Sequence, residues 1–348
     1  MIGFMTPLIL LLAGAVYAQD TGARMDDVLS SAASQKRFMG TALVARGGKI
    51  ILEKGYGMAD IELEVPNTPD RKFRLGSITK QFTAAAIMQL QERGKLSVSD
   101  LACKFIDDCP EAWKAVTIHH LLSHTSGIPS YTSMPEFPKP QFMRLPLKPL
   151  EILMLTRNKP LDFQPGEGYL YDNTGYLFLG CIIEKVTGGS YAKYLQTHIF
   201  EPLGMKNSGY DDTRAILKGR AKGYSIGPQG LRNADYLDMS LPHAAGALYS
   251  TVRDLYLWDR ALYTEKVVSK KSYDSMTRVV RRDYGYGLGL APAFNRKQVA
   301  HGGGIHGFSS WIGRFPDDDA VVIVLSNFDG GNPAALAKQL GGILGEGK

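Results

Sequence analysis

A serine and a lysine lie three residues apart in the segment from Gly76 to Lys80, which reads Gly-Ser-Ile-Thr-Lys. Because residues at this spacing share one face of a helix, Lys80 can place its amine beside the hydroxyl of Ser77. A serine hydroxyl becomes a strong nucleophile when a base removes its proton, and a lysine can be that base when its pKa is depressed. Ser77 is therefore a candidate nucleophile and Lys80 its candidate base. The same pattern also occurs by chance where a serine caps a helix and the lysine faces water.

A tyrosine and an asparagine form a second candidate group, in the turn-forming stretch from Pro165 to Asn173. This stretch precedes an apolar helix predicted over residues 176–186, and Tyr171 and Asn173 alternate along it in an extended segment. A phenol that faces the serine and the lysine can pass a proton to a leaving group, and a side-chain amide can hold a substrate carbonyl. The alternative interpretation is that Tyr171 is a core aromatic residue whose hydroxyl is satisfied within the protein.

Three glycines follow His301 and lead towards a strand predicted over residues 308–314. Bare backbone beside a strand favours a ligand that lies against it. The exposed strand edge can hydrogen-bond an acyl or peptide substrate, and one of its N–H groups can complete an oxyanion hole with that of Ser77. His301, Gly303 and Gly304 are therefore candidate substrate-binding residues. The alternative is a flexible glycine-rich loop beside an incidental histidine.

Strand-like runs near both ends of the chain predict the sheet that must hold these groups. Residues 41–45 and 49–54 flank Gly47-Gly48, which is the pattern of a two-residue hairpin. Residues 308–314 and 320–326 form a second strand-like pair. The sequence therefore predicts an antiparallel sheet that is built from both ends of the chain.

The residues between these ends are mostly helical in pattern. Apolar residues recur at helical spacing from Ile78 up to a stop at Gly94, and Thr251 caps a further helix that ends near Leu262. We expect an α/β fold in which an antiparallel sheet is flanked by helices and a mostly helical domain is inserted. The expected sheet domain comprises residues 19–76 and 284–348, and the expected helical domain comprises residues 77–283.

Composition suits a globular protein, because 44% of the 348 residues are hydrophobic and 21% are charged. The net charge of +6 is spread along the chain without a basic run, so no nucleic-acid partner is expected. Cys103 and Cys109 flank a short polar loop and could pair in an oxidising compartment. Cys181 lies in an apolar run, which predicts a small buried hydrophobe.

The first residues of the chain predict export. Residues 8–16 form a short apolar run, and the following Tyr17-Ala18 offers compact residues to a signal peptidase. We expect residues 1–18 to be a signal peptide that is cleaved after Ala18, and the mature protein to be periplasmic or secreted. The run is shorter than the ~20 apolar residues that span a bilayer, so no stable membrane span is expected.

Other chemistries find little support. His120 and His124 are four residues apart, with His119 adjacent, but no glutamate completes an H-E-x-x-H zinc motif, and packing is the better interpretation. The G-x-S-x-G motif of α/β-hydrolases and the phosphate-binding motif G-x-x-x-x-G-K-[ST] are both absent from the sequence. We expect neither a metal nor a cofactor.

The three candidate groups are far more specific together than alone. With these three groups in this order and at this spacing, the sequence resembles the β-lactamase-related serine hydrolases, close to class C β-lactamases and DD-peptidases. This family also includes esterases and D-aminopeptidases. The resemblance runs from about Gly40 to Asn327. It includes three further stretches: His120 to Pro129, Pro202 to Met205, and Ala245 to Ser250.

This resemblance implies a β-lactamase/transpeptidase-like fold and a serine hydrolase that is acylated on Ser77 by an ester, an amide or a β-lactam. It further implies that Lys80 and Tyr171 share the proton transfer and that Asn173 contacts the substrate. The backbone N–H groups of Ser77 and Gly304 would form the oxyanion hole. The implied partner is a small or short peptide acyl substrate, and the oligomeric state stays open.

The third motif departs from the class C pattern, which is usually Lys-Thr-Gly, because here it begins with His301. A histidine has an unperturbed pKa of about 6.5 and is mostly neutral at pH 7.5, so it anchors a carboxylate poorly. We expect penicillins to bind weakly at this pH and better towards pH 6. The alternative function is a slow penicillin-recognising or peptidoglycan-binding protein of the same fold, but the intact pair of Ser77 and Lys80 with Tyr171 favours an enzyme.

Overall fold

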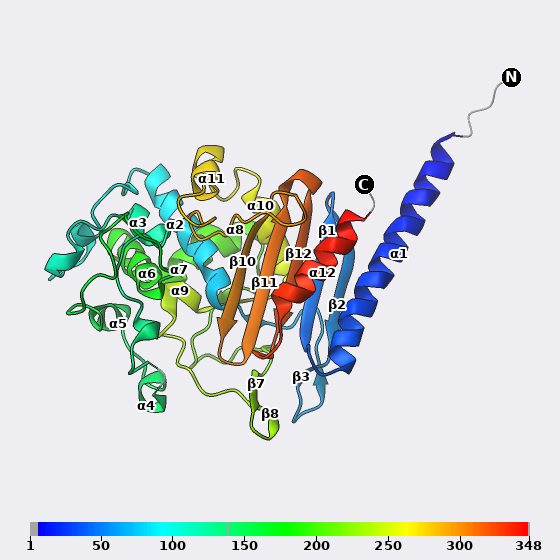
Figure 1. Cartoon of the computed structure of the whole chain (residues 1–348), viewed down its shortest axis with the longest axis horizontal. Helices are drawn as coiled ribbons and strands as arrows, with labels where there is room; N and C mark the ends of the chain where they lie inside the picture. The colour runs from blue at the N-terminus through cyan, green and yellow to red at the C-terminus, as the bar shows by residue number, and fades with distance from the viewer. Residues whose placement is uncertain (1–5, 138, 347–348) are drawn as a thin grey trace.

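The computed structural model describes residues 6–137 and 139–346, and its centre is a five-stranded sheet in the order β10-β11-β12-β1-β2 (Figure 1). All four neighbouring pairs are antiparallel. The strands are β1 (Gly40–Arg46), β2 (Lys49–Tyr56), β10 (Val299–Ile305), β11 (Phe308–Phe315) and β12 (Ala320–Ser326). Since β1 pairs with β12, both ends of the chain build one sheet, and the predicted fold class is confirmed.

Both faces of the sheet are covered, and this explains why β12 is apolar at almost every position. Val321, Ile323 and Leu325 contribute to the larger core, on the side of the helical region. Val322 and Val324 alternate with them and contribute to a second core, which α1 (Thr6–Ser34) and α12 (Pro333–Gly345) complete. These two helices lie side by side on that face in Figure 1. The alternation follows the two-residue period of a strand.

The remaining helices gather on the opposite face of the sheet (Figure 1). The helices are α2 (Thr79–Glu92), α3 (Ile118–Leu122), α4 (Pro140–Met143), α5 (Pro149–Met154), α6 (Asn173–Thr187), α7 (Tyr191–Leu195), α8 (Glu201–Leu203), α9 (His243–Gly246), α10 (Val252–Leu262) and α11 (Lys270–Met276). The short strands are β3 (Met58–Asp60), β4 (Val65–Pro66), β5 (Phe73–Arg74), β6 (Gly209–Tyr210), β7 (Tyr224–Gly227), β8 (Gly230–Asn233) and β9 (Leu248–Ser250). The α10 helix packs on β1 and β12. The expected domain boundaries stay predictions.

Two helix ends follow their capping residues as predicted, and one helix starts earlier than predicted. Gly94 follows the last turn of α2 with a φ of +66°, and the Thr251 side chain accepts a hydrogen bond at the start of α10. The α6 helix begins at Asn173 and not at residue 176, because the Asp172 carboxylate accepts hydrogen bonds from the N–H groups of its first turn. Asn173 therefore belongs to a helix and not to an extended segment.

The predicted signal peptide covers residues 1–18, of which residues 1–5 lie outside the described part of the chain. From Thr6 onwards the backbone is helical, and α1 continues through Ala18 to Ser34 without a break. The signal peptide and its cleavage site stay predictions. Among the described residues, no helix combines the length and the apolarity that crossing a bilayer requires.

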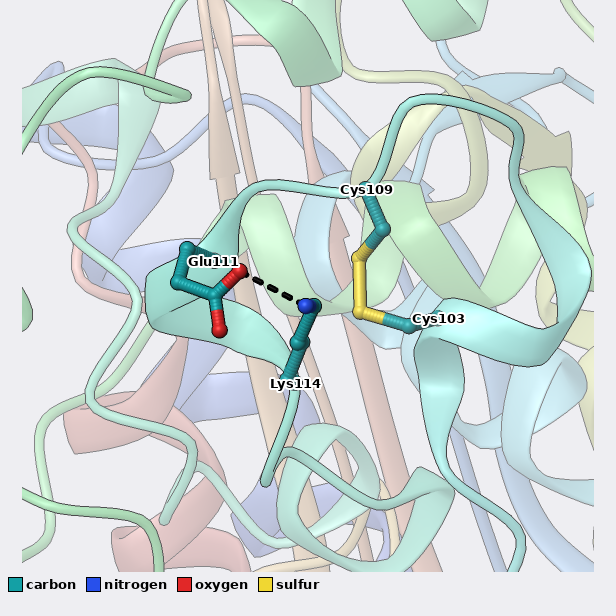
Figure 2. The surroundings of a disulfide bond; sticks show 4 residues. All are labelled: Cys103, Cys109, Glu111 and Lys114. Atoms are coloured by element: carbon teal, nitrogen blue, oxygen red, sulfur yellow. Dashed lines mark ion pairs between the residues drawn. A yellow bond between two sulfur atoms is a disulfide. The ribbon is translucent and has the colours of Figure 1, made fainter.

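Cys103 and Cys109 form a disulfide, with their Cα atoms 5.4 Å apart (Figure 2). It closes the short polar loop between them, and the ion pair of Lys114 with Glu111 lies beside it. Cys181 is buried within α6, as its apolar surroundings predicted.

Candidate active site

The candidate nucleophile lies on a 3-10 turn of residues 76–78 that leads directly into α2. Gly76 has a φ of +54°, and a Cβ atom there would lie 2.9 Å from the backbone nitrogen of Gly304. The turn therefore requires glycine at this position and packs against the backbone of β10. Leu75, just before the turn, is anchored to the sheet because its carbonyl accepts a hydrogen bond from Ser310 Oγ at 2.7 Å.

The amine of Lys80 is fully buried and contacts three polar atoms. Its Nζ atom lies 3.0 Å from Ser77 Oγ, 2.8 Å from Asn173 Oδ1 and 2.9 Å from the carbonyl oxygen of Ala245. A neutral amine has two protons and one lone pair. It can donate to the amide and carbonyl oxygens, which leaves the lone pair to accept the proton of Ser77. This arrangement positions Lys80 as a general base.

Burial lowers the pKa of Lys80 to about 7, because charging an amine without water is unfavourable. The carboxylate of Asp172 opposes this shift, since its negative charge stabilises the protonated amine. Asp172 is itself buried, and burial raises its pKa, while the backbone N–H groups at the start of α6 favour the charged form. Near neutral pH, Lys80 can therefore both accept and release a proton.

The phenol of Tyr171 lies over the same pair of residues. The Nζ atom of Lys80 is 4.8 Å from the centroid of the Tyr171 ring. Burial raises the pKa of Tyr171 far above its ordinary value, and a hydrogen bond with Ser77 only partly opposes the shift. The phenol therefore stays protonated at neutral pH, which suits a proton donor to a leaving group better than a phenolate base.

His124 holds Tyr171 in place, although no sequence motif predicted a role for it in the site. Its ring centroid lies 4.3 Å from that of Tyr171 and 4.8 Å from that of Tyr284, and its Nδ1 accepts the backbone N–H of Asp172 at 3.1 Å. Burial and the charge of Lys80 lower the pKa of His124 well below its ordinary value, so the ring is neutral. The only sequence signal was its place in a stretch that carried the family resemblance.

The amide of Asn173 is engaged at both ends. Its Oδ1 accepts from Lys80, and its Nδ2 donates to Thr132 Oγ1 at 3.1 Å. The structure thus brings Asn173 to the lysine and makes it an orienting partner of the amine. Its predicted contact with a substrate stays a prediction.

His301 is buried, and both of its ring nitrogens already have partners within the protein. Its Nε2 lies 2.9 Å from the hydroxyl of Tyr284, and its Nδ1 lies 2.6 Å from the carbonyl oxygen of Gly302. A neutral imidazole satisfies both contacts, by donating from Nδ1 and accepting at Nε2. Burial, together with the charge of Lys80, lowers the pKa of His301 to about 4. The expected gain of penicillin binding between pH 7.5 and pH 6 is therefore wrong, because the buried ring stays neutral over that whole range.

The glycines after His301 place bare backbone beside the nucleophile. A Cβ atom on Gly303 would lie 1.9 Å from the carbonyl oxygen of Leu75, so no side chain fits there. Ala300 exchanges two backbone hydrogen bonds with Gly289 on the outer edge of β10. Because alternate residues of an antiparallel strand point the same way, the N–H group of Gly304 also faces that edge, where it can join that of Ser77 in an oxyanion hole.

The histidines considered as metal ligands serve other contacts. His119 Nδ1 lies 2.6 Å from the Tyr286 hydroxyl, and the ring of His120 accepts the backbone N–H of Thr117 at the start of α3. In the part of the chain that the structure describes, no three His, Cys, Asp or Glu side chains are grouped to hold a metal ion.

The pH dependence of turnover tests the role of the buried amine. The value of kcat/KM for a neutral ester should rise about tenfold per pH unit below pH ~7 and level off above it, since only unprotonated Lys80 can act as a base. His124 and His301 are neutral over this range, and Tyr171 is protonated. Burial also raises the pKa of Asp172 to about 7, so Lys80 and Asp172 titrate as a coupled pair. Asp172→Asn removes the charge that stabilises protonated Lys80, so the rise should move to lower pH. A profile that is flat from about pH 5 to pH 8 would exclude Lys80 as the base.

Comparisons with known proteins show which proteins the chain as a whole is similar to. A family model described as Beta-lactamase matches residues 23–342. Penicillin-binding protein 4* of Bacillus subtilis is 31% identical over 331 residues, which cover 89% of this chain and 72% of that protein. The octameric penicillin-binding protein homologue from Pyrococcus abyssi superposes with a TM-score of 0.84 at 33% identity and covers 93% of this chain and 77% of its own. A D-stereospecific amidohydrolase from Streptomyces sp. has a TM-score of 0.79 at 27% identity, and the match covers 90% of this chain and 96% of that one.

Proposed function

The chain belongs to the beta-lactamase family of serine hydrolases, and we propose that it hydrolyses esters and amides without a free carboxylate through an acyl-enzyme on Ser77. The observation that carries the proposal is the 3.0 Å contact between Ser77 Oγ and the buried Nζ of Lys80. A nucleophile in hydrogen-bond contact with an oriented base is the arrangement that acyl transfer requires.

The proposed reaction has two halves. Ser77 Oγ attacks the substrate carbonyl while its proton passes to Lys80, and the N–H groups of Ser77 and Gly304 stabilise the negative oxygen. Tyr171 then gives its proton to the leaving atom, and the proton held by Lys80 restores the phenol. Water attacks the acyl-enzyme with the same groups in reverse and releases Ser77.

The preference for substrates without a carboxylate follows from the third motif. A fixed cation at the position of His301 would hold a carboxylate next to the scissile bond, but the buried imidazole is neutral at pH 7. His301→Lys should therefore favour substrates that carry a carboxylate there. The D-stereospecific amidohydrolase among the similar structures supports amides of D-amino acids as one candidate class.

We also propose that the protein works outside the cytoplasm. The Cys103–Cys109 disulfide supports this location, because disulfides persist in oxidising compartments. The predicted signal peptide of residues 1–18 would deliver the chain there.

A panel of substrates tests the proposed function. The purified protein is incubated with a small ester, a D-amino acid amide, a D-Ala-D-Ala peptide and a chromogenic β-lactam, and turnover is compared with adducts seen by intact mass. We expect efficient turnover of the ester and the amide, and slow turnover of the two compounds that carry a carboxylate. Penicillin hydrolysis that is efficient and independent of pH would contradict the preference. Stable adducts on Ser77 without turnover of any compound would instead favour a penicillin-recognising protein.

A further inference from the structure

A cavity of about 210 Å³ opens at the outer edge of β10, next to the candidate active site. Tyr171, Tyr284 and His301 line it together with Trp311, which packs against the second core on the other face of the sheet. Ser77 and Gly304 do not line it. The cavity is therefore adjacent to the reacting atoms and does not contain them.

At this edge, only the backbone of β10 separates the side chains on one face of the sheet from those on the other. Gly302 lies opposite Trp311 in the register of β10 and β11. A Cβ atom on Gly302 would lie 3.2 Å from the indole ring, so the glycine lets the indole reach the edge of the strand. Aromatic side chains from both sides of the strand thus line the cavity.

The lining carries no formal charge at neutral pH. Its nine residues include no Lys, Arg, Asp or Glu, and Gln298 contributes only a neutral amide. The imidazole of His301 is neutral because it is buried, and its two nitrogens are occupied by Tyr284 and Gly302. A charged group that entered this cavity would lose water without gaining an ion partner. An uncharged ring would gain contact with three aromatic side chains.

The positions of the reacting groups determine whether the acyl part or the leaving part of a substrate enters the cavity. The carbonyl oxygen must lie at the N–H groups of Ser77 and Gly304. Tyr171 hydrogen-bonds Ser77 and also lines the cavity, so a leaving atom that takes the phenol proton lies at the cavity mouth. Gly302 is two residues from Gly304 along the strand, about 7 Å away. The group attached to the leaving atom therefore extends into the cavity.

We propose that this cavity is a leaving-group pocket that selects substrates whose alcohol or amine part bears an uncharged aromatic ring. The proposal rests on the proposed function and adds the chemical class of the group that departs. A cavity of about 150 Å³ is large enough to hold benzene, so the observed volume accommodates one ring.

Two esters with the same acyl group and different alcohols test the pocket. Benzyl and ethyl esters of one D-amino acid are compared by kcat/KM, because their alcohols are similarly poor leaving groups. We expect the benzyl ester to be favoured by about tenfold or more. Ala291 is an exposed lining residue, so Ala291→Trp fills the pocket and should reduce this ratio to near one. Ala215→Trp, an equal change at an exposed site in the loop between β6 and β7, should keep it.

A charged variant makes the test independent of pocket volume. Ala291→Lys should raise kcat/KM for a 3-carboxybenzyl ester relative to the benzyl ester by about tenfold, since the new ammonium can pair with the carboxylate. A wild-type ratio near one, or a ratio that Ala291→Trp leaves intact, would overturn the leaving-group pocket while Ser77 adducts still support the proposed function. The absence of both turnover and a Ser77 adduct with either ester would overturn both.

Discussion

Ser77→Ala should abolish hydrolysis of every substrate. Without the hydroxyl there is no acyl-enzyme, and removing the nucleophile of a serine protease lowers kcat on the order of 10⁶-fold. The fold should persist, because Ser77 is partly exposed on its turn and makes no capping hydrogen bond there. Surface changes of this kind shift the free energy of unfolding by roughly 0.5 kcal/mol. Steady-state rates, intact-mass spectra after incubation with an ester, and thermal unfolding measure the three consequences.

A nearby serine provides the matched control. Ser133 is exposed on the loop that also carries Thr132, the partner of Asn173, so Ser133→Ala makes the same chemical change close to the site. It should keep full activity and full adduct formation. An acyl adduct that still forms on a folded Ser77→Ala variant would place the nucleophile elsewhere.

Local patterns were enough to predict the sheet and the Ser77–Lys80 pair. The strands β1 and β2 are marked by β-branched runs around a glycine pair, and the serine and lysine are one helical turn apart. These features depend on neighbours in sequence, so they can be read without the tertiary structure. The start of α6 could also have been predicted from the sequence, because Asp172 before Thr174 is a common N-cap pattern. The prediction followed the apolar run instead and therefore placed the start at a later residue.

Long-range burial explains what the sequence could not predict. The third contact of Lys80 is a backbone carbonyl, that of Ala245, which any residue type could supply. His301 was expected to titrate near its ordinary pKa, yet the fold buries it against Tyr284, which the sequence analysis did not single out. The pKa of a histidine depends on how deeply the fold buries it, and the residue types of a short motif do not determine that burial.

Variants of Lys80 and of Tyr171 should affect hydrolysis differently, and the difference should depend on the leaving group. With an ethyl ester, Lys80→Ala and Tyr171→Phe should each lower kcat/KM by about 10²–10⁴-fold, the usual cost of removing a positioned base or acid. Lys80→Arg keeps a positive charge but cannot be deprotonated, so it should be as slow as Lys80→Ala if the amine acts as a base. Lys80→Ala leaves buried oxygen atoms without a hydrogen-bond donor, which can destabilise the fold. Thermal unfolding of each variant therefore separates a loss of stability from a loss of activity.

Tyr171→Phe keeps the ring that packs on His124 and removes only the phenolic hydroxyl, so its effect should depend on the alcohol that departs. A 4-nitrophenolate leaves without a proton, whereas an alkoxide needs one. The kcat/KM of the variant, which reports the acylation step, should therefore lie within about tenfold of the wild-type value for a 4-nitrophenyl ester and far lower for an ethyl ester. Lys80→Ala should slow both esters alike, because the base acts on Ser77 before the leaving group matters. Equal losses for both esters in Tyr171→Phe would show that the phenol serves the nucleophile, and the proton for the leaving group must then come directly from Lys80.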